Sequence, residues 1–405
     1  MNSKVLKSKR ERAVKLLKEL IAIPSSNPHI SDRDERRIAR FLKGELEDSG
    51  LEVKLQQVTS KPYWLHDGGR SYTRPNVIAR TGVTGGKKLI LNGHIDTVSG
   101  ATMKHPFEPR SKGDKLYGRG SADMKGGVAA IVAGTEAILE SRRKLKGELV
   151  LSLVVDEETL GTGTIDFVKA ERGNFAVVAE PTNNTLGVAQ AGYLDFNIYS
   201  RGNSQHGQTT IPTAWASAFV QATNVCNRIL ADHSLIRKVH GNPSMETTFN
   251  FSPTSQTPLP SLAWMTMEEY RTNCLLGLIP QTTLARSKRA IKATVKRVKQ
   301  IVRDSNREGQ QNRFEIVDLK PGFIQARNAY TRAFEKAMQT TLGHHKYSYV
   351  LSFCDASYLY LANIPTVLFG PGKMEQGHST NEYTSIRQVK DATSVFTHAI
   401  NNILT

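Results

Sequence analysis

Short apolar segments alternate with longer segments of helical periodicity in the N-terminal part of the chain. The short segments, at residues 88–92, 149–155 and 175–179, have the length and composition of buried strands. Between them, apolar residues recur every three or four positions, as in helices that pack one face against a core. Strands that are apolar throughout and alternate with helices predict an α/β fold, in which a mostly parallel sheet carries helices on both faces.

The same alternation returns near the C-terminus, after a middle segment of different character. Residues 329–342 and 389–404 predict helices, and residues 365–369 predict a strand between them. In the middle segment, from 192 to 313, the apolar content falls, and prolines interrupt one stretch. The α/β pattern is therefore interrupted and later resumed.

This interruption predicts two domains. Residues 1–191 and 314–405 are expected to form one α/β domain in two parts, and residues 192–313 a smaller inserted α+β domain. The insertion contains a predicted helix at 286–303, with valine and isoleucine on one side. The other side of this helix carries eight basic residues and no acidic one.

The chain as a whole is basic, with 54 Lys and Arg against 37 Asp and Glu and a formal net charge of +17. Such an excess favours nucleic acid, an anionic surface or an anionic substrate as a partner. Many exposed lysines on an ordinary globular protein would give the same total. No zinc-finger, KH or RRM motif accompanies the basic helix, so nucleic-acid binding is not expected.

Bulk composition narrows the class of protein further. A hydrophobic fraction of 39% and a charged fraction of 22% are typical of a globular chain rather than a disordered one. No run of about 18 apolar residues predicts a membrane span, and no signal-peptide core is found near the start. The three cysteines, Cys226, Cys274 and Cys354, form no C-x-x-C pair. We therefore expect a reduced, cytoplasmic location.

Five short segments of the α/β part each place a histidine or a carboxylate at the C-terminal end of a predicted strand, or just after it. Taken singly, each has an ordinary explanation: a structural histidine, a solvated pair of acids, or a helix cap. Together at one sheet edge they would repel each other and lose hydration unless cations were present. Two divalent ions sharing a bridging carboxylate would satisfy them, and zinc accepts both imidazole and carboxylate ligands. The residues are His94 and Asp96; Asp123; Asp156, Glu157 and Glu158; Glu180; and His378 and Glu382.

The motifs HIDTV, GRGSADMKGG, DEETLGTGT, VAEP and GHSTNEY resemble, in order and spacing, the M20 family of metallohydrolases. That family includes acetylornithine deacetylase, succinyl-diaminopimelate desuccinylase, aminoacylase-1 and glutamate carboxypeptidase. The resemblance extends over nearly the whole chain, from LLKELIAIPS to the final helix. It implies a catalytic α/β domain and an inserted lid or dimerisation domain.

The resemblance also implies roles for the site residues. It implies two divalent metal ions per subunit, with zinc expected and cobalt or manganese as alternatives. Glu180 stands where the family's aminopeptidases often carry Asp, which favours a deacylase or carboxypeptidase. The implied roles are His94, Glu158, Glu180 and His378 as ligands, Asp123 as the bridge, Asp96 as the residue that orients His94, and Glu157 as general base.

Two further roles come from the inserted domain. The resemblance implies that His206 supplies an oxyanion donor to the partner subunit of a homodimer. Arg289 lies near the position of the family's substrate-carboxylate arginine. The surrounding sequence departs from the family, however: Gln205 and Gly207 flank the histidine, and the usual Gly-Gly turn is missing from FSPTSQT. The substrate-binding residue is therefore less well defined than the metal ligands.

The expected protein is thus a zinc-dependent amidohydrolase that removes an N-acyl group from a small, anionic N-acylated amino acid. Water would be activated by metal, with Glu157 as general base. Within the same class, an M20-type metallo-carboxypeptidase or dipeptidase is the alternative. A member that has lost catalysis and acts as a binding protein is a third possibility, which the complete set of ligand candidates disfavours.

Overall fold

The computed structural model falls into two compact units. The first unit contains residues 1–188, 325–348 and 354–405, and the second contains 189–324 and 349–353. The residues that the structure describes are 3–28, 34–61, 70–100, 103–202, 218–236, 249–253, 269–306 and 311–405.

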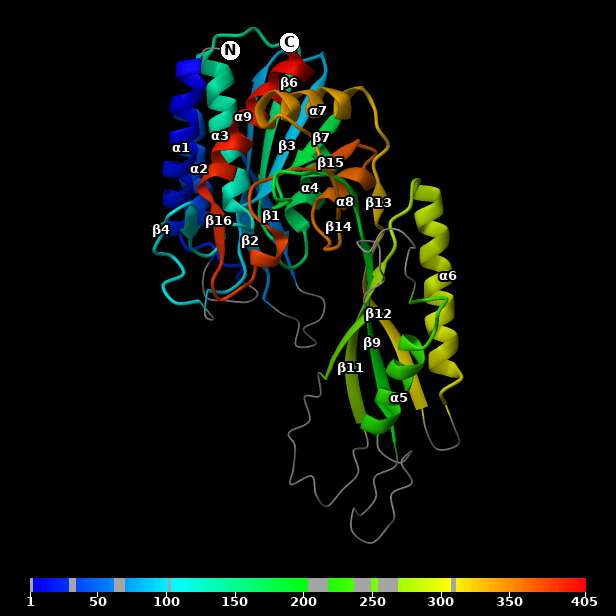
Figure 1. Ribbon diagram of the computed structural model, residues 1–405. Coiled ribbons are helices and arrows are strands. Elements are labelled where there is room, and N and C mark those ends of the chain that lie inside the picture. The colour runs from blue at the N-terminus through cyan, green and yellow to red at the C-terminus, as the bar shows by residue number, and fades with distance from the viewer. Residues whose placement is uncertain are drawn as a thin grey trace. The chain divides into compact units, whose positions relative to one another are not determined.

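The first unit is built on a large sheet with strand order β1-β2-β6-β3-β7-β15-β8 (Figure 1). Its centre is parallel, from β6 through β3 and β7 to β15, and its outer strands are antiparallel. The strands of the centre are buried on both faces, which explains their unbroken apolar sequences. The bounds are β1 Glu52–Ser60, β2 Tyr72–Gly82, β3 Lys88–His94, β6 Glu148–Val154, β7 Phe175–Val178, β8 Leu186–Gln190 and β15 Thr366–Leu368.

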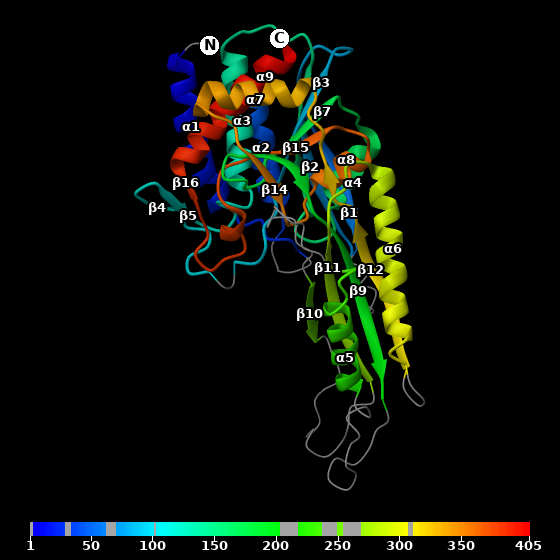
Figure 2. The same cartoon turned by 45° about the vertical axis from the view of Figure 1, so that its right-hand side comes forward.

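Helices cover both faces of this sheet, which confirms the predicted α/β class (Figure 2). One layer contains α1, α2, α3, α7 and α9, and the other contains α4 and α8. In the first layer, α3 packs between α1 and α9, so it is buried along most of its length. The bounds are α1 Ser3–Ala22, α2 Arg36–Asp48, α3 Lys125–Glu140, α4 Thr162–Ala170, α7 Ala329–Leu342, α8 Ala356–Leu361 and α9 Ile386–Leu404.

Smaller elements complete the first unit. A three-stranded sheet has the order β16-β5-β4, with β4 Arg110–Lys112, β5 Lys115–Tyr117 and β16 Tyr383–Ser385. Strand β14 (Tyr347–Val350), which pairs with β8, has its first two residues in this unit and its last two in the second. The short 3₁₀ helix η3 (Met374–Gln376) precedes β16.

The second unit is a four-stranded antiparallel sheet, order β10-β11-β9-β12, with α5 and α6 packed on one face. Its core joins Phe196 and Ile198 of the sheet to Val225 of α5 and Val298 of α6. Strand β13 pairs with the last two residues of β8, which also belong to this unit. The bounds are β9 Gly192–Arg201, α5 Ala218–Leu230, β10 Phe249–Pro253, β11 Glu269–Leu278, α6 Leu284–Arg303, β12 Gln311–Lys320 and β13 Phe323–Ile324.

The end of the second unit differs from the sequence prediction. The inserted domain was expected to end at residue 313, with 314–405 returning to the first domain. In the structure β12 continues to Lys320, paired with β9 along its length apart from a bulge. Residues 314–324 and 349–353 therefore lie in the second unit.

The predicted helix at 286–303 corresponds to α6, and its basic side is exposed. Its apolar positions, including Val298, Ile301 and Val302, are buried in the core of the second unit. Arg297, one of the basic residues of this helix, forms an ion pair with Asp232, with Nη2 2.6 Å from Oδ2. Among the helices in the described part of the chain, none is long and apolar enough to cross a membrane.

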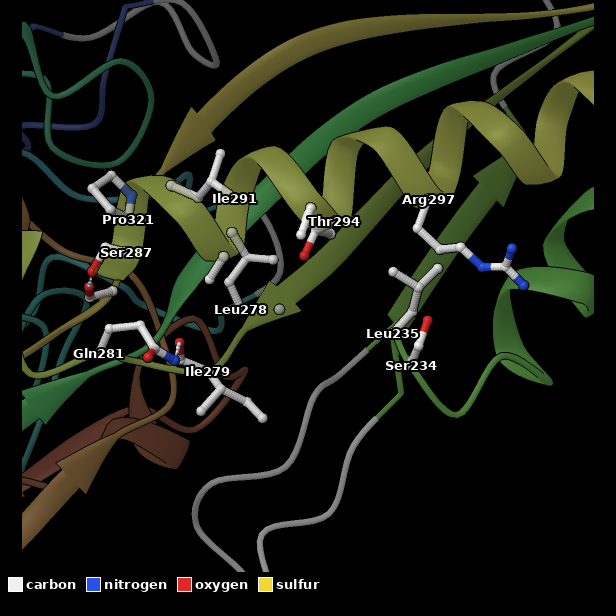
Figure 3. Close-up of a pocket in the computed structure, with 14 residues that line it drawn as sticks. Ser234, Leu235, Leu278, Ile279, Gln281, Ser287, Ile291, Thr294, Arg297 and Pro321 are labelled. Atoms are coloured by element: carbon white, nitrogen blue, oxygen red, sulfur yellow. Dashed lines mark hydrogen bonds between the residues drawn. The ribbon is translucent and has the colours of Figure 1, made fainter. Parts of the chain in front are cut away.

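A pocket lies within the second unit, between the first half of α6 and the end of β11 (Figure 3). Leu235, Leu278 and Ile291 give it an apolar lining, and Arg297 stands at one end. No described residue that the sequence singled out for chemistry lines this pocket. The predicted metal ligands and Glu157 lie instead in the first unit.

Candidate metal centre

Side chains able to bind metal gather at the carboxyl end of the parallel strands, the edge where open α/β sheets bind ligands. His94 is the last residue of β3, Glu158 comes shortly after β6, and Glu180 shortly after β7. Asp123 lies in the turn before α3, and His378 between η3 and β16. Strand topology thus brings together residues that are far apart in the sequence.

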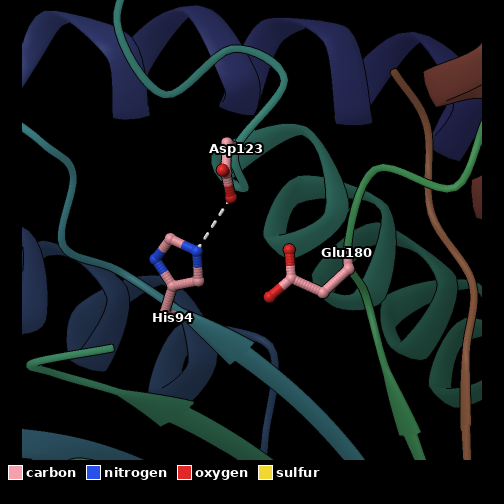
Figure 4. Close-up of side chains that lie close together, drawn as sticks. All are labelled: His94, Asp123 and Glu180. Carbon is pink, nitrogen blue, oxygen red and sulfur yellow. Dashed lines mark hydrogen bonds and ion pairs between the residues drawn. The ribbon is translucent and has the colours of Figure 1, made fainter. Parts of the chain in front are cut away.

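Two groups of these side chains could each hold a metal ion. The first is His94, Asp123 and Glu180, shown in Figure 4, and the second is Asp123, Glu158 and His378. Within each group the potential ligand atoms all lie within 4.8 Å of one another. Asp123 belongs to both groups, which is the arrangement expected of a carboxylate that bridges two ions.

Short contacts hold these groups together. His94 Nε2 lies 3.0 Å from Asp123 Oδ1, and His378 Nε2 lies 3.5 Å from Asp123 Oδ2. His378 Nε2 is also 2.9 Å from Glu158 Oε2. The two carboxylate oxygens of Asp123 are therefore each directed toward a different histidine.

Asp96 connects the histidine to the loop after β6. His94 Nδ1 lies 3.0 Å from the backbone carbonyl oxygen of Asp96 and 3.5 Å from its Oδ1. The fully buried Asp96 carboxylate accepts the backbone N–H groups of Glu157 and Glu158, at 3.2 and 3.1 Å. It also accepts the side-chain amide of Asn27. Asp96 thus orients both an imidazole and the segment that carries two glutamates.

The centre is strongly acidic for a buried site. Burial is the largest cause that raises the pKa of Glu157, Glu158 and Glu180, and the neighbouring carboxylates raise each one further. Burial lowers the pKa of His94, but hydrogen bonds to Asp123 and Asp96 and the charges of Glu157 and Asp96 more than compensate, so this pKa is raised well above normal. The buried carboxylates therefore favour positively charged groups among them.

These residues fit two divalent cations. Imidazole nitrogens and carboxylate oxygens are ligands that zinc, cobalt and manganese accept. Cations among the carboxylates would remove the mutual repulsion that raises their pKa values. Chemically, the donor set matches what the sequence predicted.

Glu157 belongs to neither ligand group. It nevertheless lies in the same electrostatic environment, since His94, Glu180 and Glu158 all affect its pKa. Glu157 is therefore not a ligand candidate among the described residues, and its role as general base stays a prediction.

Two non-glycine residues near the centre have a left-handed backbone. The φ angle is +71° at Asp156, just before Glu157, and +59° at His378. Such conformations cost of order 1 kcal/mol or more and occur often at functional sites. They turn the chain sharply where it presents Glu157 and His378.

Residues 90–402 match the description Peptidase family M20/M25/M40. The chain belongs to this family. It is therefore an M20-type hydrolase that acts on amide bonds. The matched segment contains every described residue of the two ligand groups.

Individual relatives show how far this similarity extends. A Peptidase M20 domain-containing protein of Schizosaccharomyces pombe is 34% identical over 48% of this chain and 45% of its own, so that alignment spans less than half of either protein. Acetylornithine deacetylase of Edwardsiella ictaluri is 25% identical over 96% of this chain and 97% of its own. A tripeptidase structure from Staphylococcus aureus superposes with a TM-score of 0.74 at 21% identity, covering 97% and 98% of the two chains. It shows a shared fold.

Two residues with predicted roles in this M20 hydrolase, His206 and Arg289, belong to the predicted inserted domain. His206 lies outside the described residues. Arg289 lies on the exposed side of α6. Its expected contact with a substrate carboxylate stays a prediction.

Asp355 is a buried carboxylate near the M20 centre that the sequence analysis missed. Its Oδ2 accepts the Thr164 hydroxyl at 2.7 Å, whereas its Oδ1 has no hydrogen-bond partner among the described residues. Burial is the main reason that its pKa is raised to about 7. The clue in the sequence was one acidic residue in an otherwise uncharged stretch from 347 to 372.

A buried ion network behind the centre was also missed. The guanidinium of Arg74 lies 3.1 Å from Glu35 Oε1 and 2.9 Å from Asp156 Oδ1, and all three side chains are fully buried. Asn27 donates to Asp156 as well as to Asp96. The network therefore supports the turn that leads into Glu157.

Proposed function

We propose that this chain is a di-metal amidohydrolase that removes the acyl group from a small N-acylated amino acid. The observation that supports the proposal is the pair of ligand groups that share Asp123. Similarity to an acetylornithine deacetylase over almost the full length of both chains favours an N-acyl amino acid as substrate. Glu180, rather than Asp, at its position is consistent with a deacylase.

In this proposal His94, Asp123 and Glu180 hold one ion, and Asp123, Glu158 and His378 hold the other. Zinc is the expected metal, with cobalt or manganese as alternatives. When bound, the ions would lower the pKa of a water molecule and polarise the scissile carbonyl. Asp96 would keep His94 in the orientation that directs Nε2 toward the centre.

Glu157 would move the proton. Its carboxylate would accept a proton from the attacking water and then donate it to the leaving nitrogen. Because burial raises the pKa of Glu157 above its normal value, the carboxylate is a stronger base than an exposed glutamate. His206 would stabilise the oxyanion from the partner subunit of a homodimer, and Arg289 would contact the substrate carboxylate.

We further propose a cytoplasmic enzyme whose dimer forms through the second unit. The exposed basic side of α6 would raise the local concentration of anionic substrates. The M20-type carboxypeptidase or dipeptidase is the alternative within the same chemistry. Substrate competition assays, rather than geometry, separate the two.

Removal of metal tests the proposal. Chelation should abolish hydrolysis, added zinc or cobalt should restore it, and two ions per chain should be found at saturation. The assay should compare N-acetyl-, N-succinyl- and N-formyl-amino acids with dipeptides. Asp123→Ala should lose both ions, because it belongs to both groups, whereas His378→Ala should lose mainly one. Full activity in metal-free protein would rule the proposal out.

A further inference from the structure

Glu382 has a buried carboxylate that accepts four hydrogen bonds, all from the short segment 119–123. Its Oε1 accepts the backbone N–H groups of Ala122 and Asp123, at 2.9 and 3.1 Å. Its Oε2 accepts the backbone N–H of Gly120 at 3.0 Å and Nη1 of Arg119 at 2.8 Å. The side chain is 1% exposed. A buried carboxylate is stable in such a place because every bond comes from an N–H donor.

The strand pairing explains how these two distant segments meet. Glu382 directly precedes β16, whose first residue, Tyr383, pairs with Tyr117 of β5. The backbone continues this contact, since Gly118 N–H donates to the carbonyl oxygen of Glu382. Arg119 is 1% exposed as well, and its Nε and Nη2 have no hydrogen-bond partner among the described residues. Its buried charge is therefore neutralised by Glu382.

Each of the two segments joined by Glu382 carries a ligand candidate. Residues 119–122 lead into Asp123, which both ligand groups share, and Glu382 lies four residues after His378. The two segments also touch beside the ligands: a Cβ atom on Gly377 would lie 2.8 Å from Asp123 Oδ2. The loop that carries His378 therefore runs directly along the shared carboxylate.

We propose that Glu382 is a positioning residue that fixes Asp123 relative to His378 and so preorganises both metal sites. This inference rests on the proposed metal centre. The carboxyl group of Asp123 contacts two histidines, but its backbone N–H is held by Glu382. Loss of the Glu382 carboxylate would thus displace the one ligand that both ions need.

The test compares metal affinity in three variants. In Glu382→Gln, an amide NH₂ would face N–H donors, and the charge of Arg119 would have no neutralising partner. Both zinc dissociation constants should rise by about 10–100-fold, the usual effect of losing a group that orients a ligand. Glu382→Asp keeps the negative charge, but its side chain is shorter by one methylene. Its affinity for zinc should therefore lie between those of the wild type and Glu382→Gln.

Glu335→Gln is the matched control. Glu335 is a 5% exposed carboxylate in the same unit, paired with Arg327 at 2.6 Å and with the Tyr347 hydroxyl at 2.8 Å. Its described partners, Arg327 and Tyr347, belong to neither ligand group. This control should lose thermal stability without losing affinity for zinc.

Calorimetric titration of the metal-free proteins with zinc measures affinity and stoichiometry, and the Co²⁺ absorption spectrum reports changes in ligand geometry. Unchanged affinity and spectrum in folded Glu382→Gln would overturn the inference, as would equal weakening in Glu335→Gln. If Glu382→Gln does not fold, wild-type affinity in Glu382→Asp would overturn it. A wild-type chain that binds no zinc would instead refute the proposed metal centre.

Discussion

At the scale of single residues, the centre concentrates acidic groups that are rarely found so close together. Glu157, Glu158 and Glu180 all have raised pKa values, because they are buried and because they face one another. Their proposed roles differ because their positions differ. Glu158 and Glu180 belong to ligand groups, and Glu157 does not.

Glu157→Gln should therefore keep both metal ions and the fold but lose about 10²–10⁴-fold in kcat. The amide is nearly the same size as the carboxylate but cannot accept a proton from water. Steady-state kinetics with metal analysis measures both effects.

Glu158→Gln is the comparison, and it should mainly weaken metal binding. Asp156 cannot easily replace the base, because Arg74 and Asn27 already bind its carboxylate. Wild-type turnover in Glu157→Gln would assign the proton transfer to another group.

Asp355 gives a prediction for pH. Its pKa is raised from 3.8 to about 7 by burial first, and also by the carboxylates of Asp96 and Asp156. The folded chain thus binds more protons than the unfolded chain between these values, so this group's contribution to stability is lost as pH rises toward 7 and above.

Asp355→Asn should remove this loss of folding stability at higher pH, because the amide does not ionise. Metal-free variant protein should melt roughly 5 °C above metal-free wild type at pH 8, and the difference should shrink as the pH is lowered to 5. Thermal unfolding followed by circular dichroism at both values measures it. An equal difference at the two values would show that ionisation of Asp355 is not the cause.

Residues of the centre could be predicted from the sequence where each follows a recognisable strand. His94 and Glu180 are examples, since both come at or just after a short apolar run. Arg74 and Glu382 were not assigned roles, because their functions depend on partners that only the folded chain brings near. Glu382 and Ala122, for instance, are 260 positions apart.

At the scale of elements, periodicity predicted the buried centre of the sheet well and its margins poorly. Strands β3, β6 and β7 are apolar throughout, so their sequences identify them. Strand β1, at the sheet edge, consists mostly of exposed and partly buried residues and has no such run. Strand β12 is mostly partly buried and also has no continuous apolar run, and only its pairing with β9 assigns it to the second unit.

Close packing between elements also decides where ligands lie. A Cβ atom on Gly127, in the first turn of α3, would lie 2.0 Å from the carbonyl oxygen of Ala179. Glycine at this position lets α3 approach the end of β7, so that Asp123 before the helix meets Glu180 after the strand. The sequence shows the glycine, but the neighbour that requires it is known only from the fold.

At the scale of the whole molecule, the chain crosses between the two units more than once. The second unit is formed by residues 189–324 together with 349–353. It is therefore an insertion within the first unit rather than a module added at one end. A residue in the insertion can serve a neighbouring subunit only if the protein associates.

The proposed role of His206 makes that association testable. His206→Ala should bind two metal ions normally and lose about 10²–10³-fold in kcat, the usual effect of removing one oxyanion donor. Co-expression of His206→Ala with Glu157→Gln should give heterodimers in which one active site has both an intact base and an intact histidine. Activity should then exceed the sum of the two variants.

The homodimers of each variant, mixed without subunit exchange, provide the baseline for this experiment. Analytical ultracentrifugation should establish that the co-expressed chains associate. Heterodimers with no recovery of activity would place His206 in its own subunit's reaction or outside the reaction altogether.

The crowding of carboxylates at the sheet edge also bears on how long the protein survives in a cell. An ion that binds only the folded chain stabilises it by about 2.7 kcal/mol when present at one hundred times its dissociation constant. A cell short of metal would then hold more unfolded chains, which proteases remove. The amount of this hydrolase would follow the supply of its metal, without any dedicated regulator.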